Sequence, residues 1–351
     1  MARERDTRGS TGSFAPFDRR ESMSKSTAGG LAAGCVHCGL CTRKCDFLTK
    51  YGLDLQEFAG REELAYHCFL CGDCGEACPK GIDGRAIALS LRQERVERAG
   101  GKVPEKGYGA LVAEKKDYLF RNYKRGAGKT VLFPGCNFPS FYPRTTDRII
   151  ALLKEKADIG VVFDCCGKPV SELGLVEADA QGTQALNRRL EELGVEELVV
   201  LCPNCYYFLK PRLTDVAVVS IYDKLRELGL GKPIRVERAH VFVPCPDKAT
   251  HELEQSFLPF LEGAWENIPG VQCCGLGGCA AGKEPELAQG FREKVKEREL
   301  PNVYAYCASC AGCLRRGGVE NVRHILVDLL ETGEASVLGA QSVWHRAKRR
   351  F

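Results

Sequence analysis

The chain reads CVHCGLCTRKC at residues 35–45 and CFLCGDCGEACP at residues 68–79. Both stretches have the spacing C-x2-C-x2-C-x3-C, so eight cysteines form two matched sets. A structural zinc ion takes four tetrahedral ligands, often from two separated pairs, and closely spaced triplets fit that geometry poorly. Thiolates at two-residue intervals can instead hold three corners of a cubic four-iron cluster. The two sets therefore predict two 4Fe-4S cubane clusters.

The fourth cysteine of each set lies too far along the chain to close easily on its own triplet. In two-cluster ferredoxins that cysteine ligates the other cluster, so we assign the ligands crosswise. The first cubane set is Cys35, Cys38, Cys41 and Cys78, and the second cubane set is Cys68, Cys71, Cys74 and Cys45. REELAYH at 61–67 and the apolar spacing within 83–100 indicate helices. We therefore expect a helical ferredoxin domain over residues 31–105.

Ten of the other twelve cysteines form a pattern of five that occurs twice, in the order C…CC…CxxC. The first quintet is Cys136, Cys165, Cys166, Cys202 and Cys205, and the second quintet is Cys245, Cys273, Cys274, Cys307 and Cys310. Matching members are 105 to 109 residues apart, which indicates an internal duplication. The two remaining cysteines, Cys279 and Cys313, are expected to be spectators or thiols beside a cluster rather than ligands.

Each copy alternates short apolar runs that end at a cysteine with helical patterns. The expected strands lie within 131–136, 159–165, 198–202, 240–245 and 302–307, and the expected helices within 145–156, 184–194, 286–300 and 322–331. This alternation predicts a small parallel α/β sheet in each copy, over 130–235 and 236–335. Ligands gather at the carboxyl ends of such strands, so each quintet should converge at one sheet edge.

An alternative interprets CPNC at 202–205 and CASC at 307–310 as separate redox dithiols, with the CC pairs as incidental buried thiols. The sequence LVVLCPNCYYFLK, a strand followed by a helix, fits a thioredoxin-like pair. The alternative leaves Cys136, Cys245 and both CC pairs unexplained. We therefore favour ligation of one cluster by each quintet.

The composition of the 351 residues fits a soluble globular protein, with 20 cysteines and a net charge of +4. No apolar run is long enough for a membrane helix, and the N-terminus has no secretory h-region. So many thiols in a reducing cytoplasm favour metal ligation, and the small charge gives no argument for nucleic acid. Residues 1–30 are expected to be a mobile extension. Residues 336–351 are expected to be a basic, solvated tail, with a docking role for a partner or a membrane surface as the alternative.

These motifs resemble the heterodisulfide reductase family, over roughly residues 30–333. The ferredoxin part is similar to the small electron-transfer subunit, here fused to a part similar to the catalytic subunit with its two CCG domains. The first CCG domain is matched by FPGCNFPSFYP, DCCGKP and LCPNC, and the second by CCGLGG and YCASC. Where the second domain of the family usually opens with a histidine-containing motif, this chain reads VFVPCPDK.

The resemblance implies that each quintet binds a noncubane 4Fe-4S cluster, in addition to the two cubanes, as used in anaerobic metabolism. The two noncubane clusters would face each other across a cleft, and the ten quintet cysteines would be the catalytic ligands. A small-molecule disulfide would give one sulfur to each cluster, and electrons delivered through the cubanes would split it into two thiols. Lys168 and Lys248 could steady acidic groups of the substrate, while His37 and His67 would tune potentials by hydrogen bonding.

Disulfide reduction takes two electrons, and each cluster passes one. The sequence shows no P-loop and no G-x-G-x-x-G in a dinucleotide-binding context, so the electrons must come from another protein. We expect a flavin-containing or membrane cytochrome subunit, or a hydrogenase or dehydrogenase module. The chain would then be cytoplasmic, or associated with a membrane through that partner.

Two other functions remain open. The chain could be an electron relay for a flavin-dependent dehydrogenase of 2-hydroxy acids or glycerol 3-phosphate, passing electrons towards quinone. It could also be a metal-binding sensor, although a sensor has no need of imported electrons. Both copies keep all five cysteines, which favours the catalytic interpretation.

Overall fold

The cysteine-rich N-terminal part is helical, as predicted. The computed structural model describes residues 27–351, and residues 1–26 of the predicted extension lie outside the described part. Thr27 caps the first helix by accepting a hydrogen bond from the Gly30 N–H, and Ala28 is buried. The elements of this part are α1 (Ala28–Ala32), α2 (Leu40–Lys44), α3 (Asp46–Tyr51), α4 (Leu55–Ala59), η1 (Glu62–His67), α5 (Asp73–Glu76), α6 (Gly84–Arg98) and α7 (Gly109–Lys115).

Local capping explains where two of these helices begin. At the start of α4 the Asp54 carboxylate accepts a hydrogen bond from the Glu57 N–H, and the Glu57 carboxylate accepts one from the Asp54 N–H. This capping box satisfies two backbone donors that a helix otherwise leaves unpaired. Asp83 caps α6 through the Arg85 N–H in the same manner. These caps set the start of α4, which follows α3, and of α6, which follows the second cysteine motif.

The first α/β unit has a five-stranded sheet in the order β1-β3-β2-β4-β5. Strands β2 to β5 are parallel, whereas β1 pairs antiparallel with β3. The predicted strands correspond to β2, β3 and β4, while β1 and β5 were not predicted. The elements are β1 (Asn122–Arg125), β2 (Thr130–Phe133), α8 (Phe138–Phe141), α9 (Pro143–Ala157), β3 (Gly160–Phe163), α10 (Lys168–Glu172), α11 (Val176–Glu192), β4 (Glu197–Val200), α12 (Pro203–Leu209), β5 (Ala217–Ser220) and α13 (Ile221–Glu227).

The second α/β unit has a four-stranded parallel sheet in the order β7-β6-β8-β9. Here β6 and β8 correspond to the predicted strands, and β7 and β9 lie at the two edges. The elements are β6 (Ile234–Phe242), η2 (Cys245–Asp247), α14 (Glu252–Phe257), η3 (Leu258–Phe260), β7 (Leu261–Asn267), η4 (Gly277–Gly282), α15 (Pro285–Lys296), β8 (Val303–Ala305), α16 (Ala308–Arg316), β9 (Arg323–His324) and α17 (Ile325–Leu329).

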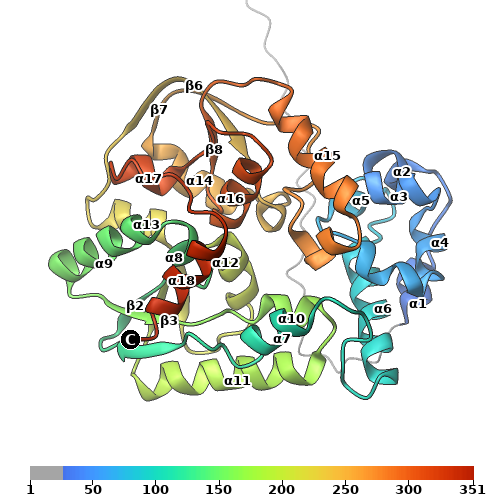
Figure 1. The fold of residues 1–351 in the computed structure, drawn as a ribbon, viewed down its shortest axis with the longest axis horizontal. Coiled ribbons are helices and arrows are strands. Elements are labelled where there is room, and N and C mark those ends of the chain that lie inside the picture. Colours follow the sequence, from blue (N-terminus) through green and yellow to red (C-terminus); the bar gives the residue numbers. More distant parts are fainter. Residues whose placement is uncertain (1–26) are drawn as a thin grey trace, which may run out of the picture.

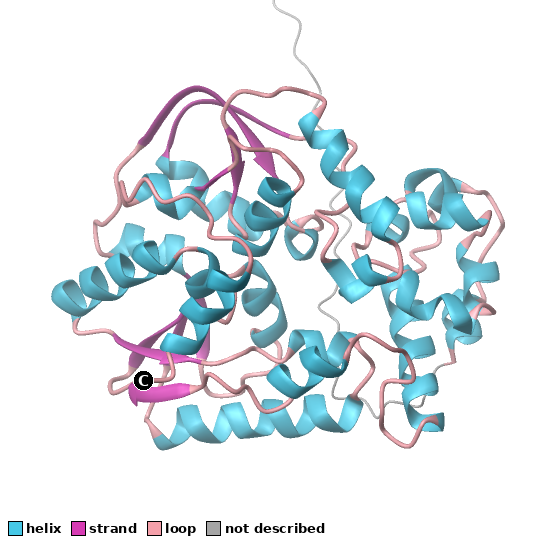
Figure 2. Cartoon of the chain, in the orientation of Figure 1, coloured by secondary structure: helices cyan, strands magenta, loops and turns pink. Residues whose placement is uncertain are grey.

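The two α/β units share one buried hydrophobic core, and the helical domain has its own. Helices that include α8, α12 and α16 lie between the two sheets, and the helical domain lies to one side of both (Figure 1 and Figure 2). A small third cluster joins the helical domain to the second unit, where the rings of Phe69 and Phe291 meet edge to face at 5.0 Å. The three parts are thus packed against one another around the cysteine motifs.

The basic C-terminal segment forms a helix, α18 (Ala340–Lys348), that packs against the first unit. The Ser140 hydroxyl donates to the Ser342 carbonyl, and the Val337 N–H donates to the Phe141 carbonyl. In contrast to the expected solvated tail, these contacts hold the segment on the protein (Figure 1). None of the helices in residues 27–351 is both long and apolar enough to cross a membrane.

Candidate metal centres

The first cubane set lines one cavity. Its four cysteines come from the loop before α2, from α2 itself and from the segment after α5, and all four border a cavity that also touches Asp54 and Lys80. Cys45, the fourth cysteine of the same sequence motif, is not among the lining residues. The structure therefore brings together the crosswise set. Cys38 is exposed, which makes this site the one nearer to solvent.

The second cubane set is buried, and its thiols affect one another. Burial and then the negative charge of Cys45 raise the pKa of Cys68 to about 11. Burial followed by the charges of Cys68, Cys45 and Cys71 raises the pKa of Cys74 well above its usual value. Four buried thiols with raised pKa values lose their protons when a metal binds, because bound iron compensates the thiolate charge. These residues fit a cluster.

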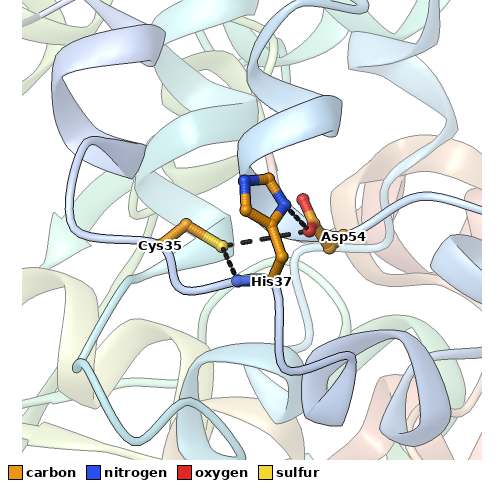
Figure 3. Close-up of side chains that lie close together, drawn as sticks. All are labelled: Cys35, His37 and Asp54. Atoms are coloured by element: carbon orange, nitrogen blue, oxygen red, sulfur yellow. Dashed lines mark hydrogen bonds and ion pairs between the residues drawn. The ribbon is translucent and has the colours of Figure 1, made fainter.

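A histidine–carboxylate pair lies beside the first cubane set (Figure 3). His37 Nδ1 is 2.6 Å from Asp54 Oδ2, and the Cys35 sulfur is 3.9 Å from the same oxygen. The His37 backbone N–H also donates to the Cys35 sulfur at 3.4 Å. Burial alone would raise the pKa of Asp54, but hydrogen bonds from Glu57 and His37 lower it. Hydrogen bonds to cluster sulfurs tune potentials, so this arrangement suits the role expected of His37.

Among residues 27–351, the hydrogen-bond partners of His67 are not cysteines. Its Nδ1 lies 2.6 Å from Glu284 Oε1 and 3.2 Å from the Tyr51 hydroxyl. Glu284 also accepts from the Lys50 ammonium at 2.6 Å, so the group connects the helical domain to the second α/β unit. The contacts of His67 therefore indicate a structural role rather than the expected tuning of a cluster.

The ten quintet cysteines form one continuous array. Hydrogen bonds connect neighbouring thiols in the order Cys136, Cys165, Cys166, Cys205, Cys202, Cys307, Cys310, Cys274, Cys273 and Cys245. The motifs follow the carboxyl ends of strands in both sheets, as the parallel topology predicts. Cys202 and Cys307, at matching positions of the two copies, connect the quintets. Two separate redox dithiols would not need such an array.

Each quintet contains one cysteine whose pKa lies below its usual value, and the pKa values of the other eight are raised. Hydrogen bonds from Cys165 and Cys205 lower the pKa of Cys166 to about 5. Hydrogen bonds from Cys202 and Cys310 keep the pKa of Cys307 well below its usual range. Thiolates are the form that binds iron, so the donor chemistry fits an iron–sulfur centre in each quintet.

Polar side chains of the two copies meet across this array. Asn204, within CPNC, places its amide nitrogen 3.8 Å from the Cys307 sulfur. The Asn137 amide donates to the Ser309 hydroxyl of CASC at 2.7 Å. Both asparagines belong to the first copy and contact the CASC motif of the second, which fixes the two quintets relative to one another.

Gln272 and Lys248 connect the second cubane set to the second quintet. The Gln272 amide nitrogen lies 3.6 Å from the Cys71 sulfur and 3.8 Å from the Cys45 sulfur. The Lys248 ammonium donates to Asp73 at 2.6 Å and to the Gln272 carbonyl at 2.9 Å. Burial would lower the pKa of Lys248, but the Cys245 and Asp73 charges raise it to about 12. Instead of the suggested contact with a substrate, Lys248 connects the helical domain to the second α/β unit.

Replacing Gln272 with leucine is expected to make the potential of the second cubane more negative. The change removes the N–H donors that face Cys45 and Cys71, and such hydrogen bonds raise cluster potentials. A hydrogen bond of about 1 kcal/mol corresponds to roughly 40 mV for a one-electron couple. A redox titration followed by electron paramagnetic resonance (EPR) measures the shift. Gln289→Leu, on the exposed face of α15, is the matched control. Equal potentials in both variants would contradict the assignment.

A second cavity lies against the first quintet, at Cys165 and Cys166. Its charged lining residues are Lys115, Lys116, Asp117, Arg121, Asp164, Asp179 and Arg189. Lys115 is buried, and although burial opposes its charge, the Cys136 and Cys165 thiolates raise its pKa above the usual value. Lys168 is not among the lining residues, and its ammonium pairs with Glu172. Sequence reasoning missed Lys115 because it comes from outside the repeated motifs.

Comparisons with known proteins agree with this division of the chain. A family model described as a 4Fe-4S dicluster domain matches residues 25–82, and one described as a cysteine-rich domain matches residues 130–210 and 240–316. A subunit of the fumarate reductase (CoM/CoB) of Methanothermobacter marburgensis is 24% identical over 339 residues, covering 80% of this chain and 66% of that protein. An uncharacterised iron–sulfur protein of Methanococcus maripaludis is 24% identical over 327 residues, covering 78% of this chain and 63% of that protein.

A further relative is a named heterodisulfide reductase subunit. It is a subunit of the dihydromethanophenazine:CoB–CoM heterodisulfide reductase of Methanosarcina mazei, and it is 22% identical over 305 residues, covering 75% of this chain and 73% of that protein. The chain spans about two thirds of the length of the fumarate reductase subunit and of the uncharacterised protein. With a dicluster domain followed by two cysteine-rich domains, it belongs to the heterodisulfide reductase-like family of iron–sulfur proteins.

Proposed function

We propose that the chain is the iron–sulfur subunit of a reductase complex and that it reduces a small-molecule disulfide to two thiols. The observation that carries the proposal is the continuous array of ten quintet thiols, with Cys71 of the second cubane set next to it. Burial raises the pKa of Cys71, and the charges of Cys245 and Cys273, which lie close to it, raise it further. The names of two relatives, a fumarate reductase subunit and a heterodisulfide reductase subunit, support the same class of reaction.

The two cubane sets would each hold a 4Fe-4S cubane, and the two quintets would each hold a noncubane 4Fe-4S cluster. When bound, these groups supply one-electron transfer and iron that can bind a substrate sulfur. Reduction of one disulfide consumes two electrons and two protons and yields two thiols. The chain contributes a largely buried, cysteine-rich site with a cation beside it, because Lys115 faces Cys136 and Cys165.

The cavity beside the first quintet provides the place where a small molecule would approach. Lys115, Arg121 and Arg189 border it, together with the carboxylate of Asp164. Arg189 Nη1 is 3.6 Å and Arg121 Nε 3.8 Å from Asp164 Oδ2, so this carboxylate holds both guanidinium groups at the cavity wall. Cationic groups in this position would orient an acidic disulfide with its sulfurs towards Cys165 and Cys166.

Electrons would enter at the first cubane set, because this set includes the exposed Cys38, whereas the second cubane set is buried against the array. The exposed residues around Cys38 include Val36, Leu40 and Lys80. We propose that an electron-donor subunit docks there, either a flavin-containing protein, a membrane cytochrome, or a hydrogenase or dehydrogenase module.

The iron content of the anaerobically purified chain should be about sixteen atoms, because four 4Fe clusters are expected. Iron and acid-labile sulfide analysis, with EPR on the reduced protein, measures this content. About eight irons per chain would mean that the quintets are empty and would contradict the proposed function. The same measurement on a variant with Cys71→Ala serves as a control, since it should lose only signals of the second cubane.

One observation favours the electron-relay alternative. Cys202 and Cys307 are hydrogen-bonded directly, so the two quintets touch without an intervening side chain. Such contact suits electron passage as well as shared substrate binding. A relay to quinone would need both quintets for electron transfer but no disulfide turnover, which an assay with an artificial donor distinguishes.

A further inference from the structure

We propose that Cys313 is a sixth cysteine ligand of the second centre, held in place by Arg292, so that the two duplicated centres are chemically different. The inference rests on the proposed binding of a cluster by each quintet. From the sequence, Cys313 is expected to be a spectator or a neighbouring thiol, so the structure assigns it a different role. This cysteine has no counterpart in the first copy.

Cys313 belongs to the second thiol group by position. It lies on α16 one helical turn after Cys310, and residues three apart share a helix face. The side chain is 1% exposed, its sulfur lies 2.9 Å from the Cys274 carbonyl oxygen, and its thiol is hydrogen-bonded to the Cys274 thiol. Cys274 therefore contacts three other thiols, those of Cys273, Cys310 and Cys313.

Arg292 is built into the site next to this sulfur. Its Nη1 lies 3.7 Å from the Cys313 sulfur, and its Nε is buried without a hydrogen-bond partner among the described residues. Two glycines leave room for the side chain. A Cβ on Gly317 would lie 2.5 Å from Arg292 Cβ, and a Cβ on Gly275, whose φ is +94°, would lie 3.0 Å from Arg292 Nη1. Arg292 itself is half-buried, and a guanidinium packed this closely is stabilised by a negative partner, which a cysteine thiolate supplies.

The first copy has a different arrangement at the matching position. Phe208 stands where the second copy has Cys313, at the same offset of 105 residues as Cys205 and Cys310. The Arg212 guanidinium lies 3.6 Å from the centre of the Phe208 ring, and Arg212 Nη2 is 3.6 Å from Asp179 Oδ2. Arg212 in the first copy thus contacts an aromatic ring and a carboxylate. Phe208 has no sulfur, so the first copy lacks a sixth thiol at this position.

The sixth ligand should change the reduction potential of the second centre in a predictable direction. An additional thiolate adds negative charge to the second centre and lowers its reduction potential relative to the first. The second centre adjoins the second cubane set through Gln272, while the first adjoins the cavity at Cys165 and Cys166. The sixth ligand would therefore favour electron transfer from the entry side towards the side where a small molecule can bind.

The test compares Cys313→Ala, Cys313→Ser and Arg292→Gln with Cys279→Ala as the matched control. Cys279 is the other cysteine outside the quintets and the cubane sets, and Cys313→Ser nearly keeps the volume of the buried side chain. Anaerobic redox titration followed by EPR and Mössbauer spectroscopy gives the signature and midpoint potential of each cluster without an activity assay. We expect both Cys313 variants to change the signature of one noncubane centre and raise its potential. Arg292→Gln should lower that potential, and Cys279→Ala should change nothing.

The outcomes separate this inference from the proposed function. Wild-type protein with all four clusters and Cys313 variants with unchanged spectra would overturn the inference alone. Wild-type protein with empty quintets, at about eight irons per chain, would overturn both. Shifts of equal sign in Cys313→Ala and Arg292→Gln would also overturn the inference, since removal of a thiolate and removal of its cation change the charge in opposite directions.

Discussion

Alanine at Cys166 is expected to reduce disulfide turnover by more than about 100-fold, and alanine at Cys274 is expected to do the same. Mutation of a residue that only supports a metal ligand usually lowers metal affinity or activity by about 10- to 100-fold, so loss of a central ligand should lower turnover further. Cys166 is hydrogen-bonded to Cys165 and Cys205, and Cys274 occupies the matching position in the second quintet. Each variant therefore removes the thiol that connects the CC pair to the CxxC pair.

The assay supplies a strong artificial electron donor and a small-molecule disulfide to the isolated chain under anaerobic conditions. Cys279→Ala is the matched control, because it removes a cysteine outside both quintets and should keep wild-type turnover. The cubane signals should persist in every variant, since the cubane sets consist of other cysteines than the quintets. If turnover survived in Cys166→Ala or Cys274→Ala, the reductase proposal would fail and the relay alternative would take its place.

The division of the chain could be predicted because its signals are short-range: cysteine spacing indicated the cluster motifs and the duplication, and apolar patterns indicated the helical domain and the two α/β units. The crosswise pairing of the cubane sets followed from the reach of a backbone between closely spaced thiols, and the first set does line one cavity. Strands β2, β4 and β8 could be predicted because each is an apolar run that ends close to a cysteine. Which sulfurs would meet between the copies, such as Cys202 and Cys307, needed the three-dimensional arrangement.

Strands and helices without a nearby cysteine or a clear apolar pattern were not predicted. Strand β7 reads LEGAWEN, with exposed or half-buried residues along its length, so no alternation marks it. The C-terminal segment looks like a solvated tail by composition, yet its position depends on partners far along the chain. Arg346 pairs with Glu114 at 2.9 Å, and Arg349 pairs with Asp147. Long-range contacts of this kind leave no local signal in a sequence.

Arg92 is the clearest case of a residue whose role only the structure reveals. Within α6 the sequence suggests an ordinary helix position, but the side chain is 0% exposed and bonds to all three parts of the protein. Its guanidinium donates to the carbonyls of Ala65, Cys68, Glu172 and Gly278 at 2.7 to 2.9 Å. It also lies 4.9 Å from the centre of the Tyr66 ring. One buried cation thereby connects the second cubane loop to both α/β units.

Arg92→Ala is expected to lower the free energy of unfolding by about 4 kcal/mol, because four buried carbonyl oxygens would each lose a charged donor. Native domains are stable by only about 5–15 kcal/mol in general, so this is a large effect. Arg92→Lys should recover little, since one ammonium cannot reproduce the planar fork of donors. Denaturant titration of the cluster-loaded chain, followed by circular dichroism and by cluster absorbance, measures both unfolding and loss of the centres.

The control is Arg98→Ala, on the same helix, where the guanidinium is largely exposed and pairs with Glu62 at the surface. Exposed ion pairs contribute little to stability, so this variant should unfold at the same denaturant concentration as the wild-type protein. Because Arg92 bonds to the Cys68 carbonyl and the Gly278 carbonyl, Arg92→Ala should also release the second cubane at lower denaturant than the rest of the fold. Simultaneous loss of cluster absorbance and helicity at the wild-type midpoint would show that the other contacts between the three parts are sufficient without this cation.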